Sequence, residues 1–96
     1  MPQFLILAND YKDAEALQRR LSVRQEHLKR MRKEKIDGRF VIGGAKLDES
    51  AQMRGSMLVV NLENETAVRQ WINEDPYVTG KVWDHIEIIP FRVAEV

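Results

Sequence analysis

The sequence predicts an α+β domain with two layers, in which an antiparallel four-stranded sheet carries two helices on one face. The first observation behind this prediction is the order of the pattern, since strand-length apolar runs and helical patterns follow one another as βαββαβ. The second is size. A chain of 96 residues, of which 44% are hydrophobic and 31% charged, can bury one core but not two. We therefore expect residues 1–96 to form a single domain.

The first half of the pattern begins with the continuous apolar run Phe4–Ala8, which has the length of a buried strand. A helical pattern follows over Lys12–Ile36, within which Ser22 could cap the start of a second helix. Asp37-Gly38 favours a helix stop, and a second strand then covers Phe40–Ile42 up to two glycines. The apolar stripe of the helical pattern consists of Leu17, Leu21, Leu28 and Met31.

The second half starts with the polar stretch Ala45–Arg54, which we expect to be a loop, and a third strand over Met57–Leu62. Asn64 then caps a second helix, which ends at Asp75-Pro76 because the residue before proline avoids the helical conformation. The last strand covers Val82–Ile89. This order of elements is that of the ferredoxin-like fold.

Both faces of the predicted sheet are apolar. Within the strands, Phe4 and Ile6 oppose Leu5 and Leu7, Met57 and Val59 oppose Leu58, Val60 and Leu62, and Ile86 and Ile88 oppose Trp83 and Ile89. Two helices cover only one face, whereas a solvated second face would alternate apolar and polar residues. We therefore expect a homodimer in which two sheets pack face to face.

Composition excludes several kinds of site and partner. The absence of cysteine rules out disulfides, thiol catalysis and cysteine-based metal centres, and two histidines are too few for an all-histidine metal site. Lys plus Arg and Asp plus Glu balance at 15 each, so no overall field favours nucleic acid. The run Phe4–Ala8 is too short for a signal segment or a membrane span. We expect a cytoplasmic protein without nucleic-acid or membrane partners.

The charge balance is uneven along the chain. Residues 11–39 carry ten basic and five acidic side chains, and the remainder carries the opposite excess. Most of this basic excess is expected to be a solvated helix face, but the region is also where a small anionic substrate would be drawn.

Four polar residues are candidates for chemistry. Arg24 lies on the helical stripe and His27 at its edge. In one interpretation His27 is a half-exposed histidine on the helix edge and the Arg24 side chain extends past it to solvent. In the other they form a pocket wall, in which Arg24 clamps an anion and His27 is a general acid or base. Asp75 either caps a turn or orients His27. Ser56 is either a solvated hydroxyl at a strand start or a donor to a ligand.

Several short motifs resemble those of the YciI-like (YCII-related) family, in the same order over nearly the whole chain. These motifs are Arg24-Gln25-Glu26-His27-Leu28, Asp37-Gly38-Arg39, Gly55-Ser56, Asp75-Pro76-Tyr77-Val78 and Ile89-Pro90-Phe91. One departure is Gly43-Gly44, where the family often has Gly-Pro. The resemblance implies a ferredoxin-like fold whose sheets pair in a dimeric α+β barrel, in agreement with the homodimer expected above. It also implies catalytic residues His27 and Asp75 in a pocket, with Arg24, Ser56, Gly55 and Tyr77 binding substrate.

The resemblance and the candidate residues together favour a small enzyme that needs no cofactor, namely a lyase, isomerase or hydrolase acting on a small anionic or ring-derived substrate. One branch of the family resembles enzymes that eliminate chloride from hydroxylated ring-breakdown products. His27 would act as a general acid or base, or as a nucleophile that accepts a phosphoryl or acyl group. The alternative is a non-enzymatic dimer that binds a small molecule. We expect no metal, since His27 and Asp75 are too few ligands for a dedicated site.

Overall fold

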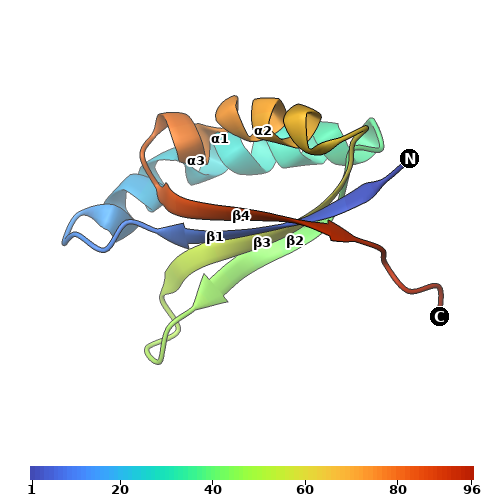
Figure 1. Cartoon of the computed structure of the whole chain (residues 1–96). Helices are drawn as coiled ribbons and strands as arrows, with labels where there is room; N and C mark the ends of the chain where they lie inside the picture. The colour runs from blue at the N-terminus through green and yellow to red at the C-terminus, as the bar shows by residue number, and fades with distance from the viewer.

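The structure is a computed structural model that describes residues 1–96. Its elements are β1 (Gln3–Asp10), α1 (Ala16–Ile36), β2 (Phe40–Leu47), β3 (Met53–Asn61), α2 (Glu65–Asn73), α3 (Pro76–Thr79) and β4 (Trp83–Phe91). All neighbouring strands pair antiparallel, in the order β2-β3-β1-β4. Figure 1 shows the helices together on one side of this sheet. The predicted ferredoxin-like fold is confirmed, with the short helix α3 in addition to the two predicted helices.

Helix α1 is continuous and shows no interruption at Ser22. The Ser22 hydroxyl donates a hydrogen bond of 2.8 Å to the Arg19 carbonyl oxygen in the preceding turn, so it does not cap a new helix. The helix stops where the sequence predicts, because Gly38 adopts a φ of +83°, which favours glycine.

The hairpin of β2 and β3 is longer than predicted. Strand β2 continues through Gly43-Gly44, and the expected loop over residues 45–54 shrinks to a turn at residues 48–52. The Asp48 carboxylate holds this turn by accepting hydrogen bonds from two of its backbone N–H groups (2.8 and 3.0 Å). The prediction was wrong here because it identified strands by their apolar side chains. The strands of an exposed hairpin are held by backbone hydrogen bonds and need no such side chains.

The core lies between the sheet and the helices. Its strand residues alternate as predicted, so that Phe4 and Ile6 face inward while Leu5 and Leu7 face outward. The core cluster comprises Phe4, Ile6, Ala8, Met31, Leu58, Val60, Val68, Trp71, Ile72, Tyr77, Val82 and Trp83.

Trp83 corrects one of the predicted faces. We expected Trp83 to oppose Ile86, but both side chains lie on the core side. The pairing of β1 with β4 shifts at the end of β1, where Asp10 pairs with Trp83 although the preceding residue pairs with His85. Asp84 is therefore skipped, and the bulge turns the Trp83 indole inward. Strand β4 also extends beyond its predicted end, through a proline that an edge strand tolerates.

The outer face of the sheet carries no helix (Figure 1). Its middle is formed by Leu5, Leu7, Met57 and Val59, and its margins by the exposed side chains of Ile42 and Ile89. The exposed Glu87 pairs with Leu7 on the same face, so the apolar surface is interrupted there. A cluster of exposed apolar side chains is typical of a protein interface. The second copy that we expect on this face stays a prediction.

A buried carboxylate ties α1 to α2 and to the start of β2. Glu34 accepts a hydrogen bond of 2.6 Å from Trp71 Nε1 and two from Arg39 (2.8 and 2.6 Å). These donors stabilise the ionised form and lower the pKa of Glu34 to about 2, with the hydrogen bonds from Arg39 as the largest cause. None of the helices has the length and apolar character needed to cross a membrane.

Candidate active site

The face of α1 that meets the rest of the protein is rotated by about one residue from the predicted stripe. Arg20, His27 and Met31 are buried, whereas Leu21, which the prediction placed inward, is 46% exposed. The prediction followed apolar side chains only. His27 was expected at the edge of the stripe, but burial of Arg20 was not, because an arginine takes a buried position only when partners from other elements satisfy it.

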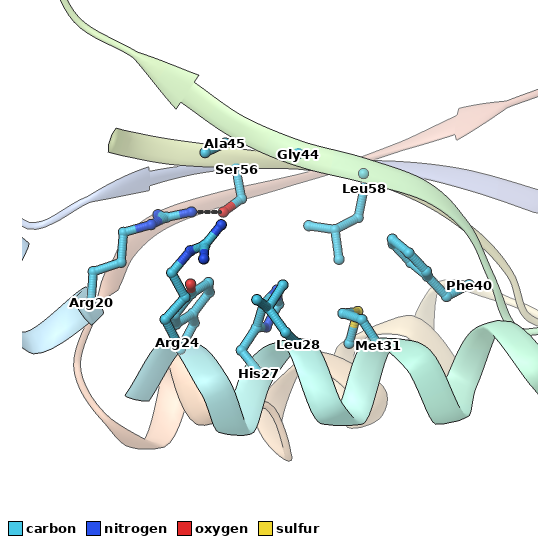
Figure 2. A pocket seen from close by; sticks show the side chains of 12 residues that line it. Arg20, Arg24, His27, Leu28, Met31, Phe40, Gly44, Ala45, Ser56 and Leu58 are labelled. Atoms are coloured by element: carbon cyan, nitrogen blue, oxygen red, sulfur yellow. Dashed lines mark hydrogen bonds between the residues drawn. The ribbon is translucent and has the colours of Figure 1, made fainter. Parts of the chain in front are cut away.

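A cavity of about 160 Å³ lies between this face of α1 and the inner face of the sheet. Its polar lining consists of Arg20, Arg24, His27, Ser56 and Tyr77, its apolar lining of Leu28, Met31, Phe40 and Leu58, and its β2 rim of Gly43, Gly44 and Ala45. Figure 2 shows the arginines and Ser56 at one end of the cavity and Phe40, Met31 and Leu58 at the other. The cavity therefore suits a small molecule with one polar and one apolar end.

His27 and Asp75, the two predicted catalytic residues, are in direct contact. The His27 Nδ1 atom lies 2.8 Å from Asp75 Oδ1, and the Asp75 side chain is completely buried. Because a carboxylate can only accept, the shared proton belongs to Nδ1, and Nε2 is left as the free nitrogen of the ring. Asp75 Oδ1 also accepts a hydrogen bond of 2.9 Å from the Tyr77 backbone N–H. The same carboxylate thus caps the turn into α3 and orients His27, so the two alternatives for Asp75 are both realised.

Arg30 holds the other oxygen of Asp75, a contact that the sequence analysis missed. Arg30 Nη1 donates to Asp75 Oδ2 at 2.9 Å, Nη2 donates to the Trp71 carbonyl oxygen at 2.7 Å, and the guanidinium lies over the Trp71 ring. The available signal was spacing, since Arg30 follows His27 by three residues and shares its side of the helix.

The His27 ring is held flat against Tyr77. The two ring centroids are 3.9 Å apart with an interplanar angle of 16°, and the Trp83 ring meets His27 edge-on at 5.9 Å. Burial raises the pKa of Tyr77, and the charges of Arg20 and Arg24 only partly oppose this effect. The contacts with the Tyr77 and Trp83 rings leave the imidazole little rotational freedom, which favours one orientation of Nε2.

A second buried network stands beside this pair. Arg20 Nη1 donates to both carboxylate oxygens of Asp10 at 2.9 Å, and Arg20 Nη2 donates to Ser56 Oγ at 2.8 Å. Ser56 Oγ also accepts a hydrogen bond of 3.1 Å from Trp83 Nε1. Burial raises the pKa of Asp10, although the Arg20 charge opposes it. Neither Arg20 nor Asp10 was predicted as a site residue; the signal for Arg20 was its position seven residues before His27.

Arg24 differs from Arg20 because no carboxylate or carbonyl oxygen of the chain pairs with it, so its charge is uncompensated by any direct contact. Its half-buried side chain lines the cavity, and in Figure 2 the guanidinium points across the cavity toward Ser56. This arrangement is the one expected of an anion clamp.

Gly55 is the one predicted binding residue that lies outside the cavity. It pairs with Asn9 and Lys46 on the outer side of the sheet. A Cβ atom at this position would lie 2.4 Å from the Ala8 carbonyl oxygen and 2.5 Å from Lys46 Cε. The role of Gly55 is therefore to allow close packing. No group of three or more His, Cys, Asp or Glu side chains is arranged to hold a metal ion.

The fold and the cavity define a ferredoxin-like α+β protein that holds a buried histidine–carboxylate pair between its first helix and its sheet. The chain belongs to the YCII-related domain family, whose model matches residues 3–92. It is 33% identical to Protein YciI of Escherichia coli O6:H1 over 95 residues, which cover 93% of this chain and 95% of that protein. It is 32% identical, with the same coverage, to an uncharacterized protein of Haemophilus influenzae.

Among solved structures, the chain is similar to the 5-chloro-2-hydroxyhydroquinone dehydrochlorinase TftG of Burkholderia phenoliruptrix, which was solved in complex with 2,5-dihydroxybenzoquinone. The TM-score is 0.80 and the sequence identity 22%, over 96% of this chain and 95% of that chain. At this identity the likeness shows a common fold.

Proposed function

We propose that this protein is a small enzyme, independent of any cofactor, that moves a proton at His27 Nε2 during a lyase, isomerase or hydrolase reaction. The observation that carries the proposal is the buried pair of His27 and Asp75, whose contact of 2.8 Å leaves Nε2 free beside the cavity. A positioned general base or acid of this kind contributes typically about 10²- to 10⁴-fold in rate.

Asp75 serves this step in two ways. Its acceptance of the Nδ1 proton selects the tautomer of the neutral imidazole in which the Nε2 lone pair can take a proton from the substrate. Its negative charge then stabilises the imidazolium that forms. The same geometry serves a nucleophilic His27, in which Nε2 accepts a phosphoryl or acyl group, and a trapped covalent adduct would distinguish this route.

The cavity supports a small substrate with an anionic group. Its volume of about 160 Å³ is below the roughly 300–1,000 Å³ of pockets for drug-sized ligands. Arg24 supplies a positive charge without a partner, while Leu28, Met31 and Phe40 form an apolar wall for the rest of the substrate. The likeness to a dehydrochlorinase solved with a dihydroxybenzoquinone supports a substrate derived from an oxygenated ring.

The protein is further proposed to act as a homodimer. The outer face of the sheet carries the half-buried side chains of Leu5 and Leu7 and, beside Leu5 on β4, the exposed side chain of Ile89. A second copy of the same face would remove these side chains from water, which is the usual arrangement for a two-fold interface.

The test is a screen of small carboxylates, lactones and hydroxylated ring compounds with wild-type protein, His27→Ala and His85→Ala. His85 is exposed on β4 and lies outside the cavity, so it is the matched histidine control. We expect turnover that falls by about 10²-fold or more in His27→Ala and is unchanged in His85→Ala. Activity that survives in His27→Ala would refute the catalytic assignment, and binding without turnover of any compound would favour the non-enzymatic alternative.

A further inference from the structure

The Ser56 hydroxyl has an unusual set of partners. Its oxygen accepts one hydrogen bond from Arg20 Nη2 at 2.8 Å and another from Trp83 Nε1 at 3.1 Å. Neither partner can accept a hydrogen bond in return, because the guanidinium and the indole N–H are donors only. The Ser56 and Arg20 residues are both buried, at 3% and 2% exposure.

Counting donors and acceptors then determines what Ser56 can offer a ligand. A hydroxyl has two acceptor lone pairs and one donor proton. The two N–H groups occupy both lone pairs, and no oxygen of the chain accepts the Ser56 proton. The proton is therefore the one hydrogen-bonding function of this side chain that is left. Since Ser56 lines the cavity, the cavity is where an acceptor can meet it.

The second group at this end of the cavity is also a donor. Arg24 lines the same cavity, lacks any carboxylate partner, and points toward Ser56 in Figure 2. The neighbouring Arg20 does not add free charge, because Asp10 accepts two hydrogen bonds from it at 2.9 Å. Arg24 and Ser56 thus offer one positive charge and one hydroxyl proton, and no carboxylate lines the cavity. Arg20 Nε is buried without a hydrogen-bond partner, so it is a further donor. The Tyr77 hydroxyl, which also lines the cavity, can donate as well as accept.

We infer that Ser56 and Arg24 form a subsite for a carboxylate or another oxyanion, in which Ser56 acts only as a hydrogen-bond donor. The inference deepens the proposed function, on which it rests, by naming the chemical group that the substrate presents at this end. It also excludes Ser56 as a nucleophile, since both of its lone pairs are engaged and Arg20 is no base. A ligand with only N–H donors at this position would leave the hydroxyl proton unpaired and would face the charge of Arg24.

The experiment compares two probes with the same carbon skeleton, 3-methylbutanoate and 3-methylbutylammonium, by isothermal titration calorimetry. Wild-type protein should bind the carboxylate in preference to the ammonium ion. A hydrogen bond to a charged group corresponds to about 10- to 100-fold in affinity, so Ser56→Ala should weaken carboxylate binding by roughly that factor. Arg24→Gln should weaken it at least as much. Ser50→Ala is the matched control, because Ser50 lies in the exposed β2–β3 turn and should bind like wild type.

Trp83→Phe separates the donor role from a general need for the serine. It removes one of the two donors to Ser56 and leaves the hydroxyl proton in place, so affinity for 3-methylbutanoate should be retained. The same variant frees one lone pair and should reduce the discrimination against the ammonium probe.

Three results would overturn the inference. They are carboxylate binding in Ser56→Ala equal to that of wild type, ammonium binding by wild type as tight as carboxylate binding, and no carboxylate binding by wild type. The last two need no variant, so they hold even if Ser56→Ala does not fold. His27→Ala distinguishes this inference from the proposed function, because loss of turnover with retained carboxylate affinity leaves the subsite intact.

Discussion

Replacing Asp75 by Asn tests the buried pair with little change in shape. Three groups donate to the Asp75 carboxylate: His27 Nδ1 at 2.8 Å and the Tyr77 backbone N–H at 2.9 Å on one oxygen, and Arg30 at 2.9 Å on the other. Asparagine has one acceptor oxygen and one NH₂ group. The backbone N–H of Tyr77 cannot move away, so the asparagine oxygen should stay on that side. The NH₂ group then faces Arg30, which loses its acceptor.

The expected cost follows from this geometry. Losing a hydrogen bond between charged groups costs about 1.5–3 kcal/mol, and the Arg30 side chain, at 18% exposure, recovers only part of its hydration. We therefore expect Asp75→Asn to lower the free energy of unfolding by about 2–3 kcal/mol. For a domain of this size that corresponds to a fall in Tm of roughly 10–20 °C. Activity should fall as well, because no negative charge remains to stabilise the His27 imidazolium.

Urea unfolding followed by circular dichroism measures this change. Asp75→Asn should shift the midpoint to lower urea with an unchanged m value. Asp84→Asn is the control, since Asp84 is exposed on β4, and surface changes of this kind stay within about 0.5 kcal/mol. A midpoint for Asp75→Asn equal to that of wild type would refute the assignment of Asp75 as a buried, charge-paired acceptor.

Three further predictions concern stability and assembly. The pKa of Glu34 is lowered to about 2, so its ionised form stabilises the fold at pH values above the usual pKa of 4.5. This contribution is lost as the pH falls from 4.5 toward 2. Glu34→Gln should therefore flatten the dependence of the free energy of unfolding on pH over that range. Leu7→Lys places a charge in the middle of the bare sheet face and should convert a dimer into a monomer in light scattering; a wild-type protein that is monomeric at micromolar concentration would contradict the proposed dimer. Gly43→Ala brings a Cβ atom within 2.7 Å of the Met57 carbonyl oxygen and should destabilise by about 1–3 kcal/mol in urea, whereas Gly44→Ala meets no atom within 4 Å and should leave the midpoint in place.

Much of the fold was predictable because its signals are local. Asn64 caps α2 as predicted, since its side chain accepts a hydrogen bond of 2.8 Å from the Ala67 backbone N–H. Gly38 ends α1 because it adopts a positive φ. The inward alternation of Phe4 and Ile6 follows from the two-residue period of a strand. Each of these features depends on residues that are close together in the chain.

The candidate site was predictable only in part. His27, Arg24 and Tyr77 were named from helical spacing and from short motifs, and all three line the cavity. Ser56 does so as well, although its strand begins earlier than predicted. Gly55, its neighbour, faces the other side of the sheet, because successive residues of a strand point to opposite faces.

The sequence by itself determined the order of the main elements and the family, and it named Arg24 and His27 as candidates on the first helix. Only the tertiary structure decided how these side chains are paired. The one-residue shift between β1 and β4 turns Trp83 inward onto Ser56, and burial of Arg20 depends on Asp10 from a different element. Such contacts join residues that are distant in the chain, so neither spacing nor composition records them. Burying a charged side chain such as Arg20 without a hydrogen-bond partner would cost too much free energy. Only the folded chain brings Asp10 within reach of Arg20.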